Sequence, residues 1–249
     1  KINLLIIGCG RHAKRIYLPL IKKYSKQYNI DLKAIVDIEN NKKDVSVYLS
    51  KLRIKCDKLF IHKLKPNKNY NLNKQHKVLL DNFIRDKKIN SVIISTDPSS
   101  HKAYAIWALS KNFNILMDKP ITARNNSSIN SNQAKKIVSD FEEINDLYKR
   151  KLKKNKKLVF LCMAQRRYHP AMQRIKKEIK RIVEKTSCPI TSITMLHSDG
   201  QWRMPKEILK ENYHGFNEGI GKCSHSGYHF FDMISWFLEE NDIKNKEID

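Results

Sequence analysis

The sequence lacks any long apolar run, and this absence excludes one class of protein. No stretch of about eighteen or more consecutive apolar residues occurs, whereas a helix that spans a bilayer needs about twenty. The apolar run at the N-terminus, Leu4 to Ile7, is short and is followed at once by glycine. Such a run is typical of a buried strand and not of a secretory signal.

Paired cysteines are also missing. The five cysteines are scattered along the chain, and no two of them form a C-x-x-C pair. A disulfide framework needs an even set of cysteines, and a structural zinc site needs closely spaced ligands. We therefore predict no disulfide framework and no metal site, and we expect the protein in the reducing cytoplasm.

Acidic residues are few beside basic ones. The chain has 25 Asp and Glu against 49 Lys and Arg, which gives a formal net charge of +24. Lysine and arginine can neutralise the phosphates of a nucleic acid, but no zinc-finger, recognition-helix or RNP pattern accompanies them. Lys, Asn and Ile are abundant together, as an adenine- and thymine-rich coding sequence would produce. We favour this compositional explanation over nucleic-acid binding, and expect the charge to attract anionic ligands.

Short apolar runs alternate with amphipathic helical patterns along most of the chain. Buried strands that alternate with such helices predict an α/β fold with a parallel sheet covered on both faces. We expect strands at residues 4–7, 32–36, 58–61, 91–95, 114–117 and 158–163, and helices at residues 12–28, from 98 onward, 132–152 and 172–182.

Two segments depart from this alternation. More than fifty residues separate Asp37 from Ser91, and we interpret them as a helix, a strand and an enlarged surface excursion. Residues 190–196 alternate like a strand of a second sheet. Only seventeen residues follow Asp232, so we expect the second domain to be incomplete.

A glycine-rich turn follows the first strand and opens a helix. Its sequence is G-x-G-x-x-A, formed by Gly8, Cys9, Gly10, Arg11, His12 and Ala13. The first glycine allows a tight turn, the second lets the backbone approach a pyrophosphate, and the alanine lets the helix pack closely on the strand. The pyrophosphate would sit at the helix N-terminus. This pattern predicts a dinucleotide-binding site that includes Arg11 and His12.

The second strand ends at an acidic residue, Asp37. A carboxylate at this place binds the ribose hydroxyls of NAD and repels the 2′-phosphate of NADP. We therefore predict NAD as the cofactor. NADP stays an alternative because Arg11 and other basic residues are near.

Three later motifs carry a family resemblance. Residues 95–101 read Ser-Thr-Asp-Pro-Ser-Ser-His, residues 117–121 read Met-Asp-Lys-Pro-Ile, and residues 219–232 read Gly-Ile-Gly-Lys-Cys-Ser-His-Ser-Gly-Tyr-His-Phe-Phe-Asp. They resemble the T-x-P-x-x-x-H, E-K-P and G-G-G-x-x-x-D-x-G-x-H-x-x-D motifs of the glucose–fructose oxidoreductase/inositol dehydrogenase family (Gfo/Idh/MocA). The motifs occur in the order of that family and cover nearly the whole chain.

The resemblance implies a fold and an activity. We expect an NAD(P)-binding Rossmann domain at residues 1–165, followed at residues 166–249 by a substrate and oligomerisation domain with a large, open, mixed sheet. The implied activity is that of an NAD(P)-dependent oxidoreductase. It transfers hydride between nicotinamide and a carbinol carbon of a sugar, polyol or nucleotide sugar. The resemblance also implies a homo-oligomer.

Residues of the site follow from the same motifs. The resemblance implies that Lys119 and His229 lie beside the nicotinamide and are catalytic. An alcohol oxidation needs a base on the hydroxyl, which a histidine can be, and a cation that stabilises the alkoxide, which a lysine can be. Further cofactor-binding residues carried over from the motifs are Thr96, Pro98, His101 and Asp118.

The pocket for substrate is predicted from Arg166, Tyr228 and Asp232. The alternative role for Arg166 is that of a solvated surface charge. The alternative role for Asp232 is that of a structural partner of another residue. On a helix, His225, His229 and Asp232 would share one face.

His225 is the largest departure from the family pattern, which has an aspartate at that place. An imidazole cannot supply a fixed negative charge, so His225 is predicted as a relay or substrate contact in the catalytic set. The pair His225 and His229 also has a spacing that can bind zinc, but no third ligand is specified. The departure motivates an alternative function, a non-catalytic dinucleotide sensor or regulatory protein on the same fold.

Overall fold

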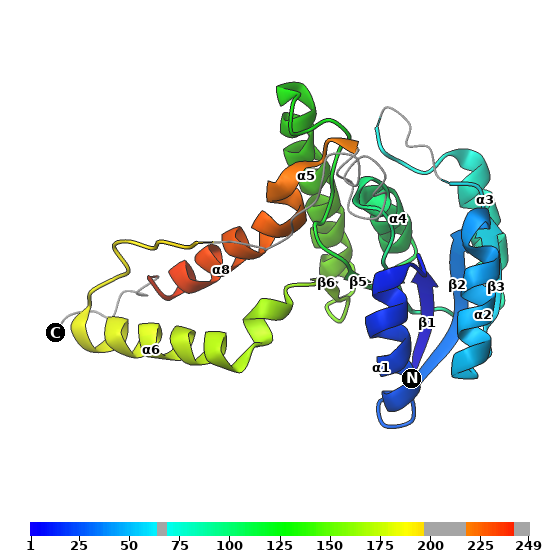
Figure 1. Ribbon diagram of the computed structural model, residues 1–249, viewed down its shortest axis with the longest axis horizontal. Helices are drawn as coiled ribbons and strands as arrows, with labels where there is room; N and C mark the ends of the chain where they lie inside the picture. The colour runs from blue at the N-terminus through cyan, green and yellow to red at the C-terminus, as the bar shows by residue number, and fades with distance from the viewer. Residues whose placement is uncertain (64–68, 197–217, 242–249) are drawn as a thin grey trace, which may run out of the picture.

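The computed structural model describes residues 1–63, 69–196 and 218–241 (Figure 1). Six parallel strands form one sheet in the order β3-β2-β1-β4-β5-β6, which is the strand order of the doubly wound dinucleotide-binding fold. The strands are β1 (Ile2–Ile7), β2 (Ile30–Ile38), β3 (Asp57–Ile61), β4 (Ser91–Ile94), β5 (Asn114–Met117) and β6 (Phe160–Cys162). The predicted α/β class and its parallel sheet are confirmed.

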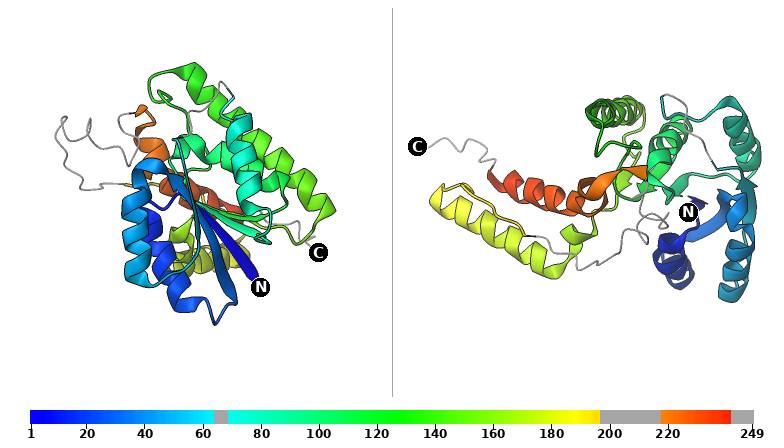
Figure 2. Two further views of the ribbon diagram at one scale, coloured as in Figure 1. Left: turned by 90° about the vertical axis from the view of Figure 1, so that its right-hand side faces the viewer. Right: turned by 45° about the horizontal axis from the view of Figure 1, so that its top comes forward.

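Helices connect the strands and cover both faces of the sheet (Figures 1 and 2). In chain order they are η1 (Ala13–Tyr17), α1 (Leu18–Tyr24), η2 (Glu39–Asn41), α2 (Lys42–Leu52), α3 (Lys74–Ile84), α4 (Pro98–Ser110) and α5 (Ser131–Lys154). Among the described residues, none of the helices combines the length and hydropathy that crossing a bilayer requires.

The central strand β1 shows why both faces are covered. Leu4 and Ile6 belong to one core with α1 and α2, whereas Leu5 and Ile7 belong to a second core with α3, α4 and α5. Successive side chains of a strand point to opposite faces, so an apolar residue at every position requires a helix layer on each side. Ile7 lies between Val36 of β2 and Ile94 of β4, and their carboxyl ends therefore meet at one edge of the sheet.

The segment between β2 and β4 holds one helix more than the sequence predicts. α2, β3 and α3 fill this stretch, so part of the expected surface excursion is a second helix. Asn73 caps α3 by accepting a hydrogen bond from the backbone N–H of His76 at 2.8 Å. The predicted first helix also differs, because it begins with the π-helical turn η1 and α1 ends at Tyr24.

Two helices extend away from the sheet after β6 (Figure 1). They are α6 (Pro170–Thr186) and α8 (Tyr228–Leu238), with short turns η3 (Gln165–Tyr168), η5 (Cys223–Gly227) and η6 (Glu239–Asn241). A small core of Met233, Trp236 and Phe237 joins them, together with apolar residues of α6 and of residues 190–195.

The strand predicted at residues 190–196 is wrong. These residues form no β-ladder, and Leu196 is exposed. A strand needs a hydrogen-bonded neighbour, and the six strands of the sheet in the described residues do not include this segment. The apolar alternation serves instead to place Ile190 and Ile193 against the two helices. The large mixed sheet expected for the second domain is accordingly absent from the described residues.

Candidate active site

The glycine turn lies at the carboxyl end of β1, and its two glycines have different roles. Gly8 has a positive φ of 88°, and a Cβ there would overlap the carbonyl oxygen of Ser95. Its N–H donates to the carbonyl oxygen of Val36 at 2.8 Å. A Cβ on Gly10 would meet no atom within 4 Å. Gly8 is therefore needed for packing between strands, whereas Gly10 faces open space.

The helix that follows presents its N-terminus at this turn. Its first backward hydrogen bond runs from the N–H of Lys14 to the carbonyl oxygen of Gly10 at 3.0 Å. The backbone N–H groups before Lys14 have no acceptor within the helix. The helix dipole adds positive potential at the same place. Ala13 is fully buried against the sheet, which agrees with the small residue that the fingerprint requires.

Asp37 holds the glycine turn in place. Its Oδ2 accepts a hydrogen bond from the N–H of Cys9 at 2.7 Å, and its Oδ1 accepts from Ile38 N and Asn41 Nδ2 at 2.6 and 2.8 Å. A carboxylate oxygen has room for about two donors, so Oδ2 has capacity for one more. The side chain is nonetheless buried, with 7% exposure.

Asp118 gathers three side chains at the ends of β4 and β5. Its Oδ1 accepts from the hydroxyl of Tyr17, and its Oδ2 accepts from Ser95 Oγ at 2.6 Å. His12 Nε2 lies 3.6 Å from Oδ1. Burial raises the pKa of Tyr17 far above its ordinary value, and the negative charge of Asp118 raises it further. The phenol therefore keeps its proton and donates it to the carboxylate in a hydrogen bond.

Lys119 follows Asp118 and is half-buried. Burial lowers the pKa of its ammonium group. The Asp118 carboxylate opposes this shift, whereas the nearby cations of Arg166 and Lys222 add to it. A lysine in this setting releases its proton at a lower pH than an exposed lysine does.

His101 fixes the segment after Lys119. Its ring is fully buried, with Nδ1 at 2.7 Å from the carbonyl oxygen of Pro120 and Nε2 at 3.1 Å from that of Thr96. The peptide bond between Lys119 and Pro120 is cis. Thr96 Oγ1 accepts a hydrogen bond from Ser100 Oγ at 3.0 Å, and Pro98 begins α4. His101 thus joins the ends of β4 and β5, and its cofactor-binding role stays a prediction.

The start of α8 reaches the same strand ends. The hydroxyl of Tyr228 lies 3.5 Å from Cys162 Sγ, which in turn lies 3.9 Å from the carbonyl oxygen of Asp118. The ring of His229 packs edge-on to that of Tyr228 at 5.5 Å between centroids, and His229 is buried. The structure therefore brings Asp118, Lys119 and the Tyr228–His229 pair to one region, although a hundred residues separate them in sequence.

The other predicted substrate residues lie beside this region and have partners in the protein. Arg167 forms a bidentate ion pair with Asp232. Its Nη2 lies 2.6 Å from Asp232 Oδ1, and its Nε lies 3.0 Å from Oδ2. The Arg166 guanidinium lies over the ring of Phe230 at 4.8 Å. These contacts support the structural alternative for Asp232 and leave the role of Arg166 a prediction.

His225 lies in the π-helical turn η5, and its side chain is outside the described part of the chain. The shared face of His225, His229 and Asp232 assumes an α-helix throughout, whereas a π-helical turn bonds each residue to the fifth one along. In the described residues, no three His, Cys, Asp or Glu side chains are grouped to hold a metal ion.

Sequence reasoning missed Tyr17, Ser95 and Cys162. Tyr17 carried a signal, since it lies four residues after Ala13 and therefore on the buried face of the first helix. Ser95 and Cys162 each end a strand or directly follow one, which places them at the edge where ligands of open parallel sheets bind.

The residues present fit a dinucleotide. Gly10 leaves the space that a pyrophosphate needs, the helix N-terminus supplies amides and positive potential, and Asp37 retains an acceptor position for a ribose hydroxyl.

No curated protein matches the chain. Several solved structures do match it and share its fold. A dehydrogenase structure from Thermus thermophilus, WlbA (WbpB) in complex with NAD and UDP-GlcNAcA, is similar with a TM-score of 0.59 and 16% identity, covering 95% of this chain and 63% of that one. A probable dehydrogenase from Thermotoga maritima has a TM-score of 0.52 and 15% identity, covering 95% of this chain and 55% of that one. An NAD-binding protein from Listeria innocua has a TM-score of 0.53 and 19% identity, covering 95% and 54%.

These likenesses concern the fold, and the chain spans less than two thirds of the length of each of these structures. A family model described as an oxidoreductase family with an NAD-binding Rossmann fold matches residues 2–160. It bears out the predicted cofactor, the Rossmann fold and the resemblance given by the motifs. The chain belongs to the Gfo/Idh/MocA oxidoreductase family.

Proposed function

We propose that the protein is an NAD(H)-dependent dehydrogenase or reductase that acts on a carbinol carbon of a sugar, polyol or nucleotide sugar. The observation that carries the proposal is the meeting of three elements at one edge of the sheet. The glycine turn lies there, Asp118 and Lys119 directly follow β5, and Tyr228 at the start of α8 reaches Cys162 at the end of β6. A homo-oligomer in the cytoplasm belongs to the same proposal.

The reaction divides between cofactor and protein. When bound, the nicotinamide supplies a site that accepts or gives hydride. Lys119 binds the substrate hydroxyl and stabilises negative charge that develops on its oxygen. Because burial lowers its pKa, Lys119 can also exchange a proton nearer to neutral pH than an ordinary lysine does.

His229 is the proposed base for the substrate hydroxyl. It sits on the first turn of α8, and its ring packs against Tyr228. A neutral imidazole nitrogen can accept the hydroxyl proton and return it. We propose His225 as a relay or a substrate contact.

Contacts within the protein hold the side chains around the proposed site of hydride transfer. Asp118 is fixed by Tyr17 and Ser95, and Cys162 packs between Asp118 and Tyr228. Charges in such a half-buried place interact more strongly than in water.

The test of this proposal is turnover with a panel of sugars, polyols and nucleotide sugars, followed by the near-ultraviolet absorbance of reduced nicotinamide. We expect Lys119→Ala to lose at least about a hundredfold in kcat, whereas Lys51→Ala, an exposed lysine of α2, retains wild-type turnover. Equal turnover of the Lys119 variant and wild type would remove Lys119 from the mechanism.

One observation favours a second function, a dinucleotide sensor without catalysis. His225 stands where the family motif has an aspartate, and Asp232 is held by Arg167. A sensor would bind NADH with saturation and turn over no substrate of the panel. Turnover of any substrate at an ordinary enzymatic rate excludes it.

A further inference from the structure

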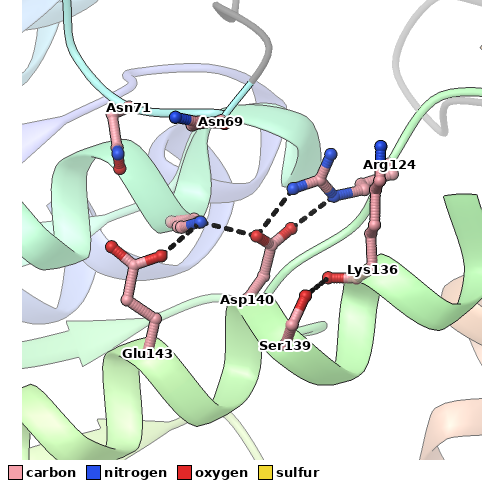
Figure 3. A pocket seen from close by; sticks show the side chains of 8 residues that line it. Asn69, Asn71, Arg124, Lys136, Ser139, Asp140 and Glu143 are labelled. Atoms are coloured by element: carbon pink, nitrogen blue, oxygen red, sulfur yellow. Dashed lines mark hydrogen bonds and ion pairs between the residues drawn. The ribbon is translucent and has the colours of Figure 1, made fainter.

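A polar cavity lies on the α4–α5 side of the sheet and shares no residue with the candidate active site. Its volume is about 300 Å³, at the lower end of the range of about 300–1,000 Å³ for small-molecule sites. The residues that line it, shown in Figure 3, are Asn69, Asn71, Lys102, Arg124, Lys136, Ser139, Asp140 and Glu143.

The floor of this cavity is a buried network of charges. Asp140, Lys102 and Arg124 are 1%, 3% and 4% exposed. Lys102 Nζ lies 2.6 Å from Asp140 Oδ1, and Arg124 reaches the same carboxylate with Nε at 2.6 Å and Nη2 at 2.8 Å. Charged groups that are buried and paired in this way have fixed positions, and a rigid floor lowers the entropic cost of binding a ligand.

Positive charge gathers at one end of the cavity. Figure 3 shows Lys136 beside Arg124, with the third nitrogen of the guanidinium, Nη1, pointing away from Asp140. Within the part of the chain that the structure describes, Lys136 forms no ion pair with an acidic residue. Figure 3 shows Asn69 beside Asn71, on the side of Glu143. Two cations suit an oxyanion such as a phosphate group.

The other end carries acceptors. Glu143 has one oxygen, Oε2, 2.7 Å from Lys102 Nζ. Figure 3 shows its second oxygen turned toward Asn71. A carboxylate in this position accepts hydrogen bonds from hydroxyl groups. The lining as a whole holds three cations, Lys102, Arg124 and Lys136, against two carboxylates, so it retains net positive charge.

We propose that this cavity is a second ligand site, which binds a small phosphorylated polyol. The phosphate contacts Lys136 and Arg124 Nη1, and the hydroxyl groups donate to Glu143. The volume limits the ligand to a few carbon atoms beyond the phosphate. The site does not depend on the proposed catalytic function, since none of its residues contacts the glycine turn or Lys119 in the interactions described above.

The chain supplies matched control variants for both ends. Lys135 and Lys136 are neighbouring exposed residues of α5, and only Lys136 lines the cavity. Glu142 and Glu143 form a second such pair. Because all four side chains are exposed, their substitution leaves the buried pair of Lys102 and Asp140 in place and the protein folded.

The experiment is calorimetric titration of the wild-type protein with glycerol 3-phosphate, inorganic phosphate and glycerol, at one ionic strength set with chloride. We expect saturable binding of glycerol 3-phosphate, weaker binding of phosphate and no binding of glycerol. We expect Lys136→Ala to weaken the binding of glycerol 3-phosphate and of phosphate by about tenfold, which corresponds to about 1.4 kcal/mol. Lys135→Ala should bind both with wild-type affinity. Glu143→Gln reduces the preference for glycerol 3-phosphate over phosphate, and Glu142→Gln retains it.

Gly10→Val separates this site from the glycine turn. It keeps glycerol 3-phosphate binding if the ligand sits in the α4–α5 cavity and loses it if the ligand sits at the turn, which would overturn the proposal. The proposal is also overturned if no saturable heat appears, or if Lys135→Ala and Lys136→Ala weaken binding equally. NADH binding by Lys136→Ala stays at the wild-type level, so failure of this site leaves the proposed dehydrogenase untouched.

Discussion

The sheet region, residues 1–162, and the helix pair, α6 with α8, are stabilised in different ways. The sheet region has two extensive apolar cores, one on each face, with fully buried residues at the centre of each. The helix pair has one small core of three buried residues. Its contacts with the sheet region include that of Tyr228 with Cys162 and those of Asn126 and Ser128 with the segment 218–219.

This difference separates two tasks. Buried apolar area is the main source of stability, so the sheet region can hold the glycine turn, Asp118 and Lys119 rigidly. The helix pair carries Tyr228 and His229, and regions with little buried apolar surface open at lower free energy. We therefore expect the two halves of the candidate site to differ in local stability.

The largest loss of stability is expected from Gly8→Val. A Cβ at Gly8 meets the carbonyl oxygen of Ser95, and its φ of 88° disfavours any residue with a side chain. The strain and the overlap together should reduce the free energy of unfolding by about 2–5 kcal/mol. Urea denaturation measures this. A Gly8 variant as stable as wild type would contradict the structure of the turn.

A core truncation in each region, with a loss no larger than that of Gly8→Val, tests the comparison directly. Leu5→Ala in β1, which is fully buried, should cost about 2–5 kcal/mol of global stability. Met233→Ala should instead speed hydrogen exchange in α6 and α8 and leave the sheet amides protected. If Met233→Ala loosens the sheet as much as Leu5→Ala does, the two regions form one cooperative unit and the comparison fails.

Arg167→Ala should have an intermediate effect, confined to the helix pair. It leaves the Asp232 carboxylate, whose side chain is 10% exposed, without its bidentate partner. An unpaired buried acceptor costs about 1–3 kcal/mol. Hydrogen exchange in α8 reports the effect, and Arg174→Ala, an exposed arginine of α6, serves as the control. Equal exchange in the two variants would show that the ion pair contributes nothing.

The smallest expected effect is a gain in stability from Lys119→Met. The pKa of Lys119 is lowered by burial, so the folded state holds this proton less tightly than the unfolded chain does. This difference lowers the free energy of unfolding by its full amount at any pH below the lowered pKa. The loss disappears as pH rises through about 10.4, the pKa of lysine in the unfolded chain. We expect the variant to be about 1 kcal/mol more stable at neutral pH and equal to wild type in strong alkali. A constant difference across this range would exclude the charge as its cause.

Much of the sheet region could be predicted from the sequence because its signals are local. The run from Leu4 to Ile7 followed by glycine predicts a strand and a phosphate-binding turn, and both the strand and the turn are present. A short motif at the end of a strand predicts that Asp118 and Lys119 belong to the site. Such patterns depend on residues within a few positions of one another, so they can be recognised without the tertiary contacts.

The remaining features depend on contacts between distant residues. The hydroxyl of Tyr17 reaches Asp118 a hundred residues later, and Arg167 reaches Asp232; no spacing rule specifies either pair. The alternation at residues 190–196 predicts a strand, yet these side chains pack on two helices, because an apolar pattern does not specify its partner. The charges around Asp140 come from three separate segments and give no motif in the sequence.

Binding of NADH to Gly10→Val tests the central claim most directly. A Cβ at Gly10 meets no protein atom, so the variant should unfold at the same urea concentration as wild type. It should nevertheless lose saturable binding of NADH in calorimetric titration, because the side chain fills the space of the pyrophosphate. A variant that stays folded and binds NADH with wild-type affinity would contradict a dinucleotide site at this turn.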